Sequence, residues 1–388
     1  MKWETLTLGD ISESIQTGPF GSQLHQSDYS ESGTPVVMPK DLINGRISTE
    51  SIARVAENHV ERLSRHKILP GDILYSRRGD VGRCAFSTEK EAGWLCGTGC
   101  LRVTIDREKA NPKFVFYQLQ TAKSVGWVEK HAVGATMLNL NTGILSAVPV
   151  AVPSLDEQNH VAEMLSAYDD LIENNQKQIK LLEEAAQRLY KEWFIDLRFP
   201  GYETTPVHDG VPEGWERKAV GELIGKVHRT TQIMTSDYLE EGTIPVVDQS
   251  RDFIAGYTND PDSLVDLGIP VIVFGDHTRI LKYITFPFAK GADGTQLIIS
   301  ADVRMPQSLL YCSLVNVDLS NYHYARHFKY LKAEEILVPA LGIAQSFDKF
   351  ATPVFEQIQC LRDENTQATN ARDRLLPKLM SGEIRKDL

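Results

Sequence analysis

The chain of 388 residues contains 42% hydrophobic and 24% charged residues, which is typical of a globular protein large enough for two or three separate cores. Its net charge of −11 excludes a uniformly basic DNA-binding domain, so any contact with DNA must come from local groups of Lys and Arg. No apolar run reaches the length of a membrane span, the N-terminus lacks a secretion signal, and the five cysteines are irregularly spaced, so we expect a cytoplasmic protein with reduced thiols and no membrane contact.

The elements follow one another in a simple order along the chain. Residues 1–153 contain short runs rich in Val and Ile, separated by Gly, Pro, Asn and Asp, and predict strands and turns. Residues 154–199 contain neither Gly nor Pro and predict a long helix. Residues 200–213 (PGYETTPVHDGVPE) predict a linker. A second β-rich domain is predicted at 214–339 and a second long helix at 340–388.

The second half of the chain repeats the first. Several short matches recur in the same order, which predicts two copies of one structural unit. They are Trp3, Glu4 and Gly9 with Trp215, Glu216 and Gly221; Gly79-Asp80 with Gly275-Asp276; NPKFVFY at 111–117 with MPQSLLY at 305–311; and Val152-Pro153 with Val338-Pro339.

Both long segments carry an apolar seam with alternating steps of four and three residues, the heptad pattern of a coiled coil. A helix packed only on its own domain is the alternative, and it would need a broader stripe that drifts at 3.6 residues per turn. Asn175 and Asn365 are the only asparagines in the two seams, and an antiparallel pairing in which residue numbers sum to 540 places them opposite each other. We therefore predict an α+β fold in which two β-rich domains are each followed by a long helix. The two helices are expected to form an antiparallel coiled coil with pseudo-two-fold symmetry.

Motifs of self-contained enzymes are not found: the sequence has no Walker loop, Rossmann fingerprint, HExxH pair or nucleophile elbow. Asp276-His277, His323 and His327 would serve acid–base or metal chemistry only if they converged, whereas loops rich in His, Tyr and Arg are ordinary in polyanion recognition. The cysteines lack the paired spacing of a zinc site. We expect no catalytic residue and no metal site.

Four polar segments offer hydrogen-bond donors beside glycines or aromatic residues: 18–22 (GPFGS), 71–83 (GDILYSRRGDVGR), 274–283 (FGDHTRILKY) and 322–330 (YHYARHFKY). Each alone would be read as a solvated turn, but their presence in both repeats favours contacts to phosphates or base edges. The candidate DNA-binding residues are Gly18, Phe20, Ser22, Arg77, Arg78, Arg83, His277, Thr278, Arg279, Lys282, Arg326 and Lys329.

Together these motifs resemble the specificity subunits of type I restriction-modification systems along essentially the whole chain. GPFGSQL at 18–24 and PSLDEQ at 153–158 are similar to the family's first half, and RHFKYL at 326–331 and RLLPKLMSGEI at 374–384 to its second half. The resemblance implies two target recognition domains, each reading one half of a split sequence in double-stranded DNA. It also implies that the helices seat two modification subunits, and that restriction subunits complete the complex. S-adenosylmethionine and ATP are then expected on those partners, with no cofactor on this chain, which would not be an enzyme by itself.

Two departures from the family pattern lie at the start of the second helix. PSLDEQ has only a degraded counterpart, PALGIAQ at 339–345, and Pro353 is expected to interrupt this helix near its start. Whether the two partner-docking sites are equivalent is therefore left open by the sequence. A β-rich adaptor that assembles through its coiled coil without reading DNA remains an alternative, as does a self-contained nuclease or methyltransferase, which the missing motifs disfavour.

Overall fold

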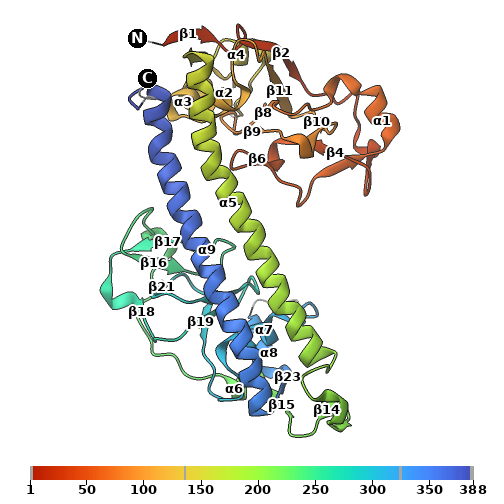
Figure 1. Ribbon diagram of the computed structural model, residues 1–388, viewed down its shortest axis with the longest axis vertical. Coiled ribbons are helices and arrows are strands. Elements are labelled where there is room, and N and C mark those ends of the chain that lie inside the picture. Colours follow the sequence, from red (N-terminus) through yellow and green to blue (C-terminus); the bar gives the residue numbers. More distant parts are fainter. Residues whose placement is uncertain (1–2, 135–136, 323–325, 385–388) are drawn as a thin grey trace. The chain divides into compact units, whose positions relative to one another are not determined.

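The computed structural model describes residues 3–134, 137–322 and 326–384 (Figure 1). Contacts divide the chain into two units, one formed by Met1–Ile172 with Gln367–Leu388 and the other by Glu173–Thr366. Each unit contains β-sheets, short helices and segments of two long helices, so the predicted α+β class is confirmed.

In the first unit, the chain enters and leaves the β-rich region through one antiparallel ribbon, in which Glu4 of β1 pairs with Val152 of β12. A four-stranded antiparallel sheet has the order β2–β11–β8–β9, and a second has the order β10–β4–β7–β3 and contains the parallel pair β10–β4. The strands are β1 (Glu4–Thr7), β2 (Ser12–Thr17), β3 (Tyr29–Ser30), β4 (Thr34–Val37), β5 (Leu42–Ile43), β6 (Arg46–Ile47), β7 (Ala53–Val55), β8 (Ile73–Ser76), β9 (Cys84–Phe86), β10 (Leu95–Cys96), β11 (Cys100–Ile105) and β12 (Pro149–Val152).

The main core of the first unit forms where α2 packs between the antiparallel sheet and the first turns of α5 (Figure 1). Phe114 and Leu119 of α2 share one buried cluster with Tyr75 of β8 and Leu165 of α5. α2 begins where the side chain of Asn111 accepts hydrogen bonds from two backbone N–H groups of the first turn, a capping arrangement that favours a helix start. The short helices of this unit are α1 (Glu57–Arg62), α2 (Pro112–Leu119), α3 (Ala122–His131) and α4 (Thr142–Ser146), with 3₁₀ turns η1 (Gln26–Asp28), η2 (Pro39–Asp41), η3 (Ser64–His66) and η4 (Glu89–Glu91).

The second unit repeats this arrangement. Its opening ribbon pairs β15 with β23, and Glu216 faces Val338 in the same register as Glu4 and Val152. An antiparallel sheet has the order β20–β19–β22, and a four-stranded sheet of order β17–β16–β21–β18 again contains one parallel pair, β16–β21. The strands are β13 (Val207–His208), β14 (Val211–Pro212), β15 (Glu216–Ala219), β16 (Ile244–Val247), β17 (Gly256–Thr258), β18 (Leu264–Val265), β19 (Val271–Gly275), β20 (Leu281–Ile284), β21 (Phe288–Lys290), β22 (Thr295–Ile298) and β23 (Glu335–Val338).

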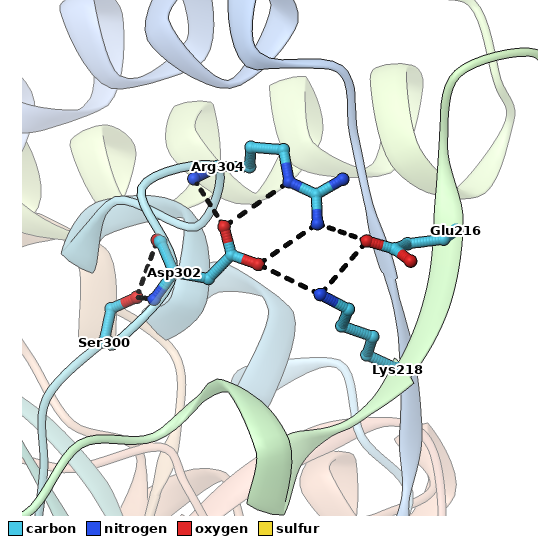
Figure 2. Close-up of polar contacts among 5 residues, drawn as sticks. All are labelled: Glu216, Lys218, Ser300, Asp302 and Arg304. Atoms are coloured by element: carbon cyan, nitrogen blue, oxygen red, sulfur yellow. Dashed lines mark hydrogen bonds and ion pairs between the residues drawn. The ribbon is translucent and has the colours of Figure 1, made fainter.

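A network of charged side chains fastens β15 to the loop that precedes α7 (Figure 2). The guanidinium of Arg304 donates to both Glu216 and Asp302, and Lys218 Nζ lies 3.1 Å from Glu216 Oε1 and 3.3 Å from Asp302 Oδ2. The backbone hydrogen bond from Arg304, joined by the side-chain bonds from Arg304 and Lys218, lowers the pKa of Asp302 to about 2. The helices of this unit are α6 (Val220–Leu223), α7 (Gln307–Val315) and α8 (His327–Ala333), with turns η6 (Tyr202–Thr204), η7 (Thr235–Asp237) and η8 (Pro261–Ser263).

The two long helices predicted from the sequence are present as α5 (Leu155–Tyr190), which ends in the short π-helix η5 (Lys191–Ile195), and α9 (Leu341–Ser381). The prediction that Pro353 interrupts the second helix is wrong, because α9 runs through this residue without a break. Pro353 lies on the exposed side of the helix, where water can hydrate the carbonyl that lacks its usual N–H partner.

Within the second unit, α5 and α9 run antiparallel, because contacts move down one helix as they move up the other. Asn175 donates to Glu364 at 2.7 Å, and Trp193 packs edge-on against Phe347 with ring centroids 6.1 Å apart. Between them Arg362 forms an ion pair of 2.9 Å with Glu183. Seam residues such as Ala186, Ala351, Ile358 and Leu361 are buried.

All five cysteines are free, and Cys96 and Cys100 lie in one buried apolar cluster, as expected for structural residues. Among the residues that the structure describes, no helix is long and apolar enough to span a membrane.

Candidate nucleic-acid interface

The arginine loop, residues 77–83, leaves the antiparallel sheet of the first unit at the end of β8. The four residues of β8 are buried, so Arg77 is the first residue that reaches the surface. Its backbone N–H donates to Gly99 at 2.8 Å, which fixes the exit of the chain from the sheet. The Arg77 guanidinium lies 6.0 Å from the ring centre of Phe20, so the two predicted loops meet at this point.

The other predicted residues of these loops differ in what they can contact. Arg78 is exposed, and Arg83 is exposed but has its Nη2 2.8 Å from Asp80 Oδ2. Phe20 is 55% exposed and Ser22 is exposed. Gly18 is buried, and a Cβ at this position would lie 1.9 Å from Gly97 O, so this glycine permits close backbone packing and offers no side chain to a ligand.

A third segment, which contains Leu138, Asn139 and Leu140, was missed by the sequence analysis. Its backbone is hydrogen-bonded to the arginine loop. Asn139 forms an antiparallel bridge with Arg78, Leu138 O accepts from Gly79 N at 3.0 Å, and Leu140 N donates to Arg77 O at 2.8 Å. This segment carries no charge run, so the only sequence signal was its clustering of Gly, Asn and Thr, which is typical of any loop.

In the second unit the equivalent loop follows β19 and is held by Gln249, another residue that the sequence analysis missed. Thr278 Oγ1 donates to Gln249 O at 2.7 Å, and the backbone N–H of His277 donates to the Gln249 side chain at 3.1 Å. Both side chains at 277 and 278 are exposed. Arg279 has a positive φ of 61° and donates to Leu319 O at 3.1 Å, so part of its guanidinium is used within the protein.

Lys282 requires a correction. It was expected to lie on the DNA-facing surface, but its side chain is only 4% exposed and its Nζ donates to Asp248 O at 2.8 Å and to Asp252 O. Burial lowers its pKa, and the nearby Asp248 and Asp252 partly oppose that effect. The residue therefore joins β20 to the segment that follows β16. Arg326 and Lys329, by contrast, are exposed.

Asp276 and His327 have structural partners within the second unit. The Asp276 carboxylate accepts from Phe328 N at 2.7 Å and its carbonyl accepts from His327 N at 3.0 Å, so this residue caps α8 from another element. His327 is buried, and its pKa is lowered first by burial and then by the charge of Arg279. His323 lies outside the described residues.

The starts of the two long helices are built from different chemistry. Gln158, in the first turn of α5, is fully buried; its side chain accepts from Asn111 N at 2.8 Å and donates to Pro153 O at 2.9 Å. The corresponding positions of the second repeat are Met305 and Ala344, which are buried in one apolar cluster. The degraded PALGIAQ motif is therefore an apolar replacement of a polar contact.

The side-chain amide of the seam residue Asn175 donates to the carboxylate of Glu364, and not to the other seam asparagine. Asn365, the next residue, has a buried Oδ1 without a hydrogen-bond partner among the described residues. Their role in fixing the register stays a prediction.

Comparison with known proteins places these features in a family. A model described as the type I restriction modification DNA specificity domain matches residues 1–184. The type I restriction enzyme MjaIX specificity subunit of Methanocaldococcus jannaschii is 26% identical over 411 residues, covering 99% of this chain and 94% of that protein. The HindI specificity subunit of Haemophilus influenzae is 20% identical over 469 residues, covering 98% and 99%.

A solved structure shares the fold: the S subunit of a type I restriction-modification system from M. genitalium is 17% identical, with a TM-score of 0.60 over 100% of this chain and 96% of that chain. The relatives extend along nearly the whole chain, and the family model covers its first β-rich region and most of α5. Residues 1–184 therefore match the type I restriction modification DNA specificity domain, and nearly the whole chain is similar to type I restriction enzyme specificity subunits.

Proposed function

We propose that the chain is the DNA-reading subunit of a type I restriction-modification complex, that it binds a bipartite target through its two units, and that it docks modification and restriction subunits without catalysing a reaction itself. The observation that carries this proposal is one arrangement of surface loops that is found in both units. In each unit, a loop after a buried strand presents exposed polar or basic side chains and is hydrogen-bonded to a later segment of the same unit.

The exposed residues differ between the two units, which suits binding to two different half-sites. In the first unit Arg78 and the Arg77–Phe20 pair can contact base edges or phosphates, since a guanidinium donates in a planar fork. In the second unit His277 is an exposed donor, and the Thr278 hydroxyl, which already donates to Gln249 O, can act only as an acceptor, while Arg326 and Lys329 lie exposed on the later segment.

The net charge of −11 supports a shared interface. Because phosphate contacts supply most of the sequence-independent affinity, a chain this acidic needs basic partners to hold DNA. We assign this part to the modification subunits, which would also carry S-adenosylmethionine, while restriction subunits would carry ATP. The contact buried at the start of α5 is polar and the one at the start of α9 is apolar, so the two docking sites need not be equivalent.

The division between half-sites is tested by a chimera. Residues 1–153 are replaced with those of a relative of different specificity, and the methylated motif is mapped in cells that also express the modification subunit. One half of the motif should change and the other should remain. A chimera that alters both halves contradicts the assignment of one unit to each half-site.

The contribution of the arginine loop is tested with Arg78→Ala, using Arg62→Ala as the matched control because Arg62 is an exposed arginine of α1. In the complex with modification subunits, Arg78→Ala should weaken specific binding by about five- to 150-fold if it contacts a base, or lower the salt slope by about one if it contacts a phosphate. Binding of modification subunits with no binding of DNA by the wild-type complex would instead support the adaptor alternative.

A further inference from the structure

A short segment with exposed apolar side chains is joined to the arginine loop, and the proposed contacts to DNA do not involve it. Its described residues are Val133, Gly134 and 137–139, here called the apolar finger. The finger is closed at its base by two backbone hydrogen bonds, Val133 N to Asn139 O at 3.0 Å and Asn139 N to Val133 O at 2.8 Å. Gly134 has a φ of +133°, and a Cβ there would lie 2.2 Å from Met137 O, so the tight path of the backbone depends on glycine.

The apolar finger is attached to the arginine loop and to the core at the same time. Leu138 O and Leu140 N hold the backbone of the arginine loop at Gly79 and Arg77. The side chain of Leu140 is fully buried and that of Leu138 packs against the main core of the first unit. The position of the finger relative to Arg78 is therefore fixed by hydrogen bonds and packing on both sides.

Two large apolar side chains of the finger remain in solvent. Val133 is 64% exposed and Met137 is 62% exposed, although their neighbours at 138 and 140 are directed to the core. Single exposed apolar residues are common on proteins, but two of them held next to the exposed Arg78 form a mixed apolar and basic surface that suits a contact. Arginine and apolar side chains side by side match DNA, where phosphates and base edges lie next to the thymine methyl group and the faces of the bases.

We propose that Val133 and Met137 contact the bases of the first half-site and add sequence discrimination that the arginines do not supply. The inference rests on the proposed function and extends it to residues that carry no charge. Apolar contacts to a base edge, of which the C5 methyl group of thymine is the usual example, depend on base identity. They neutralise no phosphate and release no counterions, so they should leave no trace in the salt dependence of binding.

The test compares Met137→Ser with Leu69→Ser in the complete complex with modification subunits. Leu69 is 52% exposed and lies just before β8, at the opposite end of this strand from Arg77, so it is a matched apolar control. The probes are a duplex that carries the methylated motif of the wild-type complex and a duplex of unrelated sequence. Met137→Ser should weaken binding to the motif by about five- to 150-fold, with unchanged salt slope and unchanged binding to the unrelated duplex. Mapping of methylation should show relaxed specificity at one position of the first half only.

Met137→Leu provides the rescue, because it keeps an apolar side chain of similar volume and should restore most of the affinity. Thermal unfolding should be the same for wild type and all variants, since position 137 is exposed. If the wild-type complex binds its motif and Met137→Ser binds it equally well, or loses affinity for both duplexes alike, the apolar finger does not read bases. If the wild-type complex selects no sequence, the proposed function itself fails.

Discussion

Replacing Lys282 with methionine should destabilise the second unit. The sequence predicts Lys282 to be a DNA contact, but its side chain is buried and bonded within the protein. Its Nζ donates to Asp248 O at 2.8 Å and to Asp252 O, and it lies 4.0 Å from the Asp248 carboxylate. Removal leaves two carbonyl acceptors without this partner, at about 1–3 kcal/mol each. The Asp248 carboxylate keeps hydrogen bonds from Ser250 N at 2.9 Å and Tyr238 Oη at 3.2 Å, and methionine keeps most of the apolar stem. A net loss of about 2–4 kcal/mol in the free energy of unfolding is therefore expected.

Lys329→Met is the matched control, because Lys329 belongs to the same unit and is exposed. For a unit of this size, 2–4 kcal/mol corresponds to a decrease in Tm of roughly 5–15 °C, measurable by calorimetry. Lys282→Met should show this decrease and keep the salt slope of DNA binding in the fully folded complex. Lys329→Met should keep its Tm and, if it contacts a phosphate, lower the salt slope by about one. An unchanged Tm with a reduced salt slope for Lys282→Met would refute the burial argument.

Three further substitutions test contacts inside the units. Gln158→Ala should lower the free energy of unfolding by about 1–3 kcal/mol in urea titrations, because Asn111 N and Pro153 O lose their buried hydrogen-bond partner. The control Gln345→Ala, at an exposed position, should change this free energy by no more than about 0.5 kcal/mol. Equal effects of the two substitutions would contradict the contacts assigned to Gln158. Tyr117→Phe removes a 2.5 Å hydrogen bond to Asp169 and should cost about 1.5–3 kcal/mol by the same assay; a neutral result would mean that this bond adds nothing to stability. Asp302→Asn should be less stable than wild type above pH 3.8, the unperturbed pKa of the carboxyl group. Because the folded-state pKa of about 2 lies below the unfolded one, this difference in stability should shrink as the pH falls toward 2. Urea midpoints at pH 7, 5 and 3 that show a constant difference would contradict this prediction.

The order of elements could be predicted because the same motifs occur in the same order in both halves of the sequence. Glu4 and Glu216 occupy the same place in the repeat, and each pairs with the Val that precedes a Pro at the start of a long helix. Heptad spacing likewise predicts the long helices, because burial of a seam requires helical periodicity over many turns. These signals are local or repeated, so one sequence is sufficient to read them.

The errors have a common physical cause, which is that local rules do not contain tertiary partners. A lysine in a polar segment is usually exposed, and only the carbonyls of Asp248 and Asp252, about thirty residues earlier, make burial of Lys282 favourable. Pro353 is a helix breaker by local preference, yet packing of the seam residues around it, such as Ala351 and Val354, keeps α9 continuous. The apolar finger was missed for the opposite reason, because a search guided by charge passes over Val133 and Met137.

Duplication explains why the two units share a scaffold and differ in chemistry. The ribbon register and the presence of one parallel strand pair are the same in both. Contacts that do not set the backbone path are free to change: Asn111 and Gln158 form a polar contact where Met305 and Ala344 are apolar. The loop residues diverge in the same way, because the exposed Arg78 precedes Gly79-Asp80 in one unit and the buried Phe274 precedes Gly275-Asp276 in the other. Under the proposed function this combination suits two unlike half-sites, since equivalent loops in each unit would approach DNA in the same way while unlike side chains would select different bases.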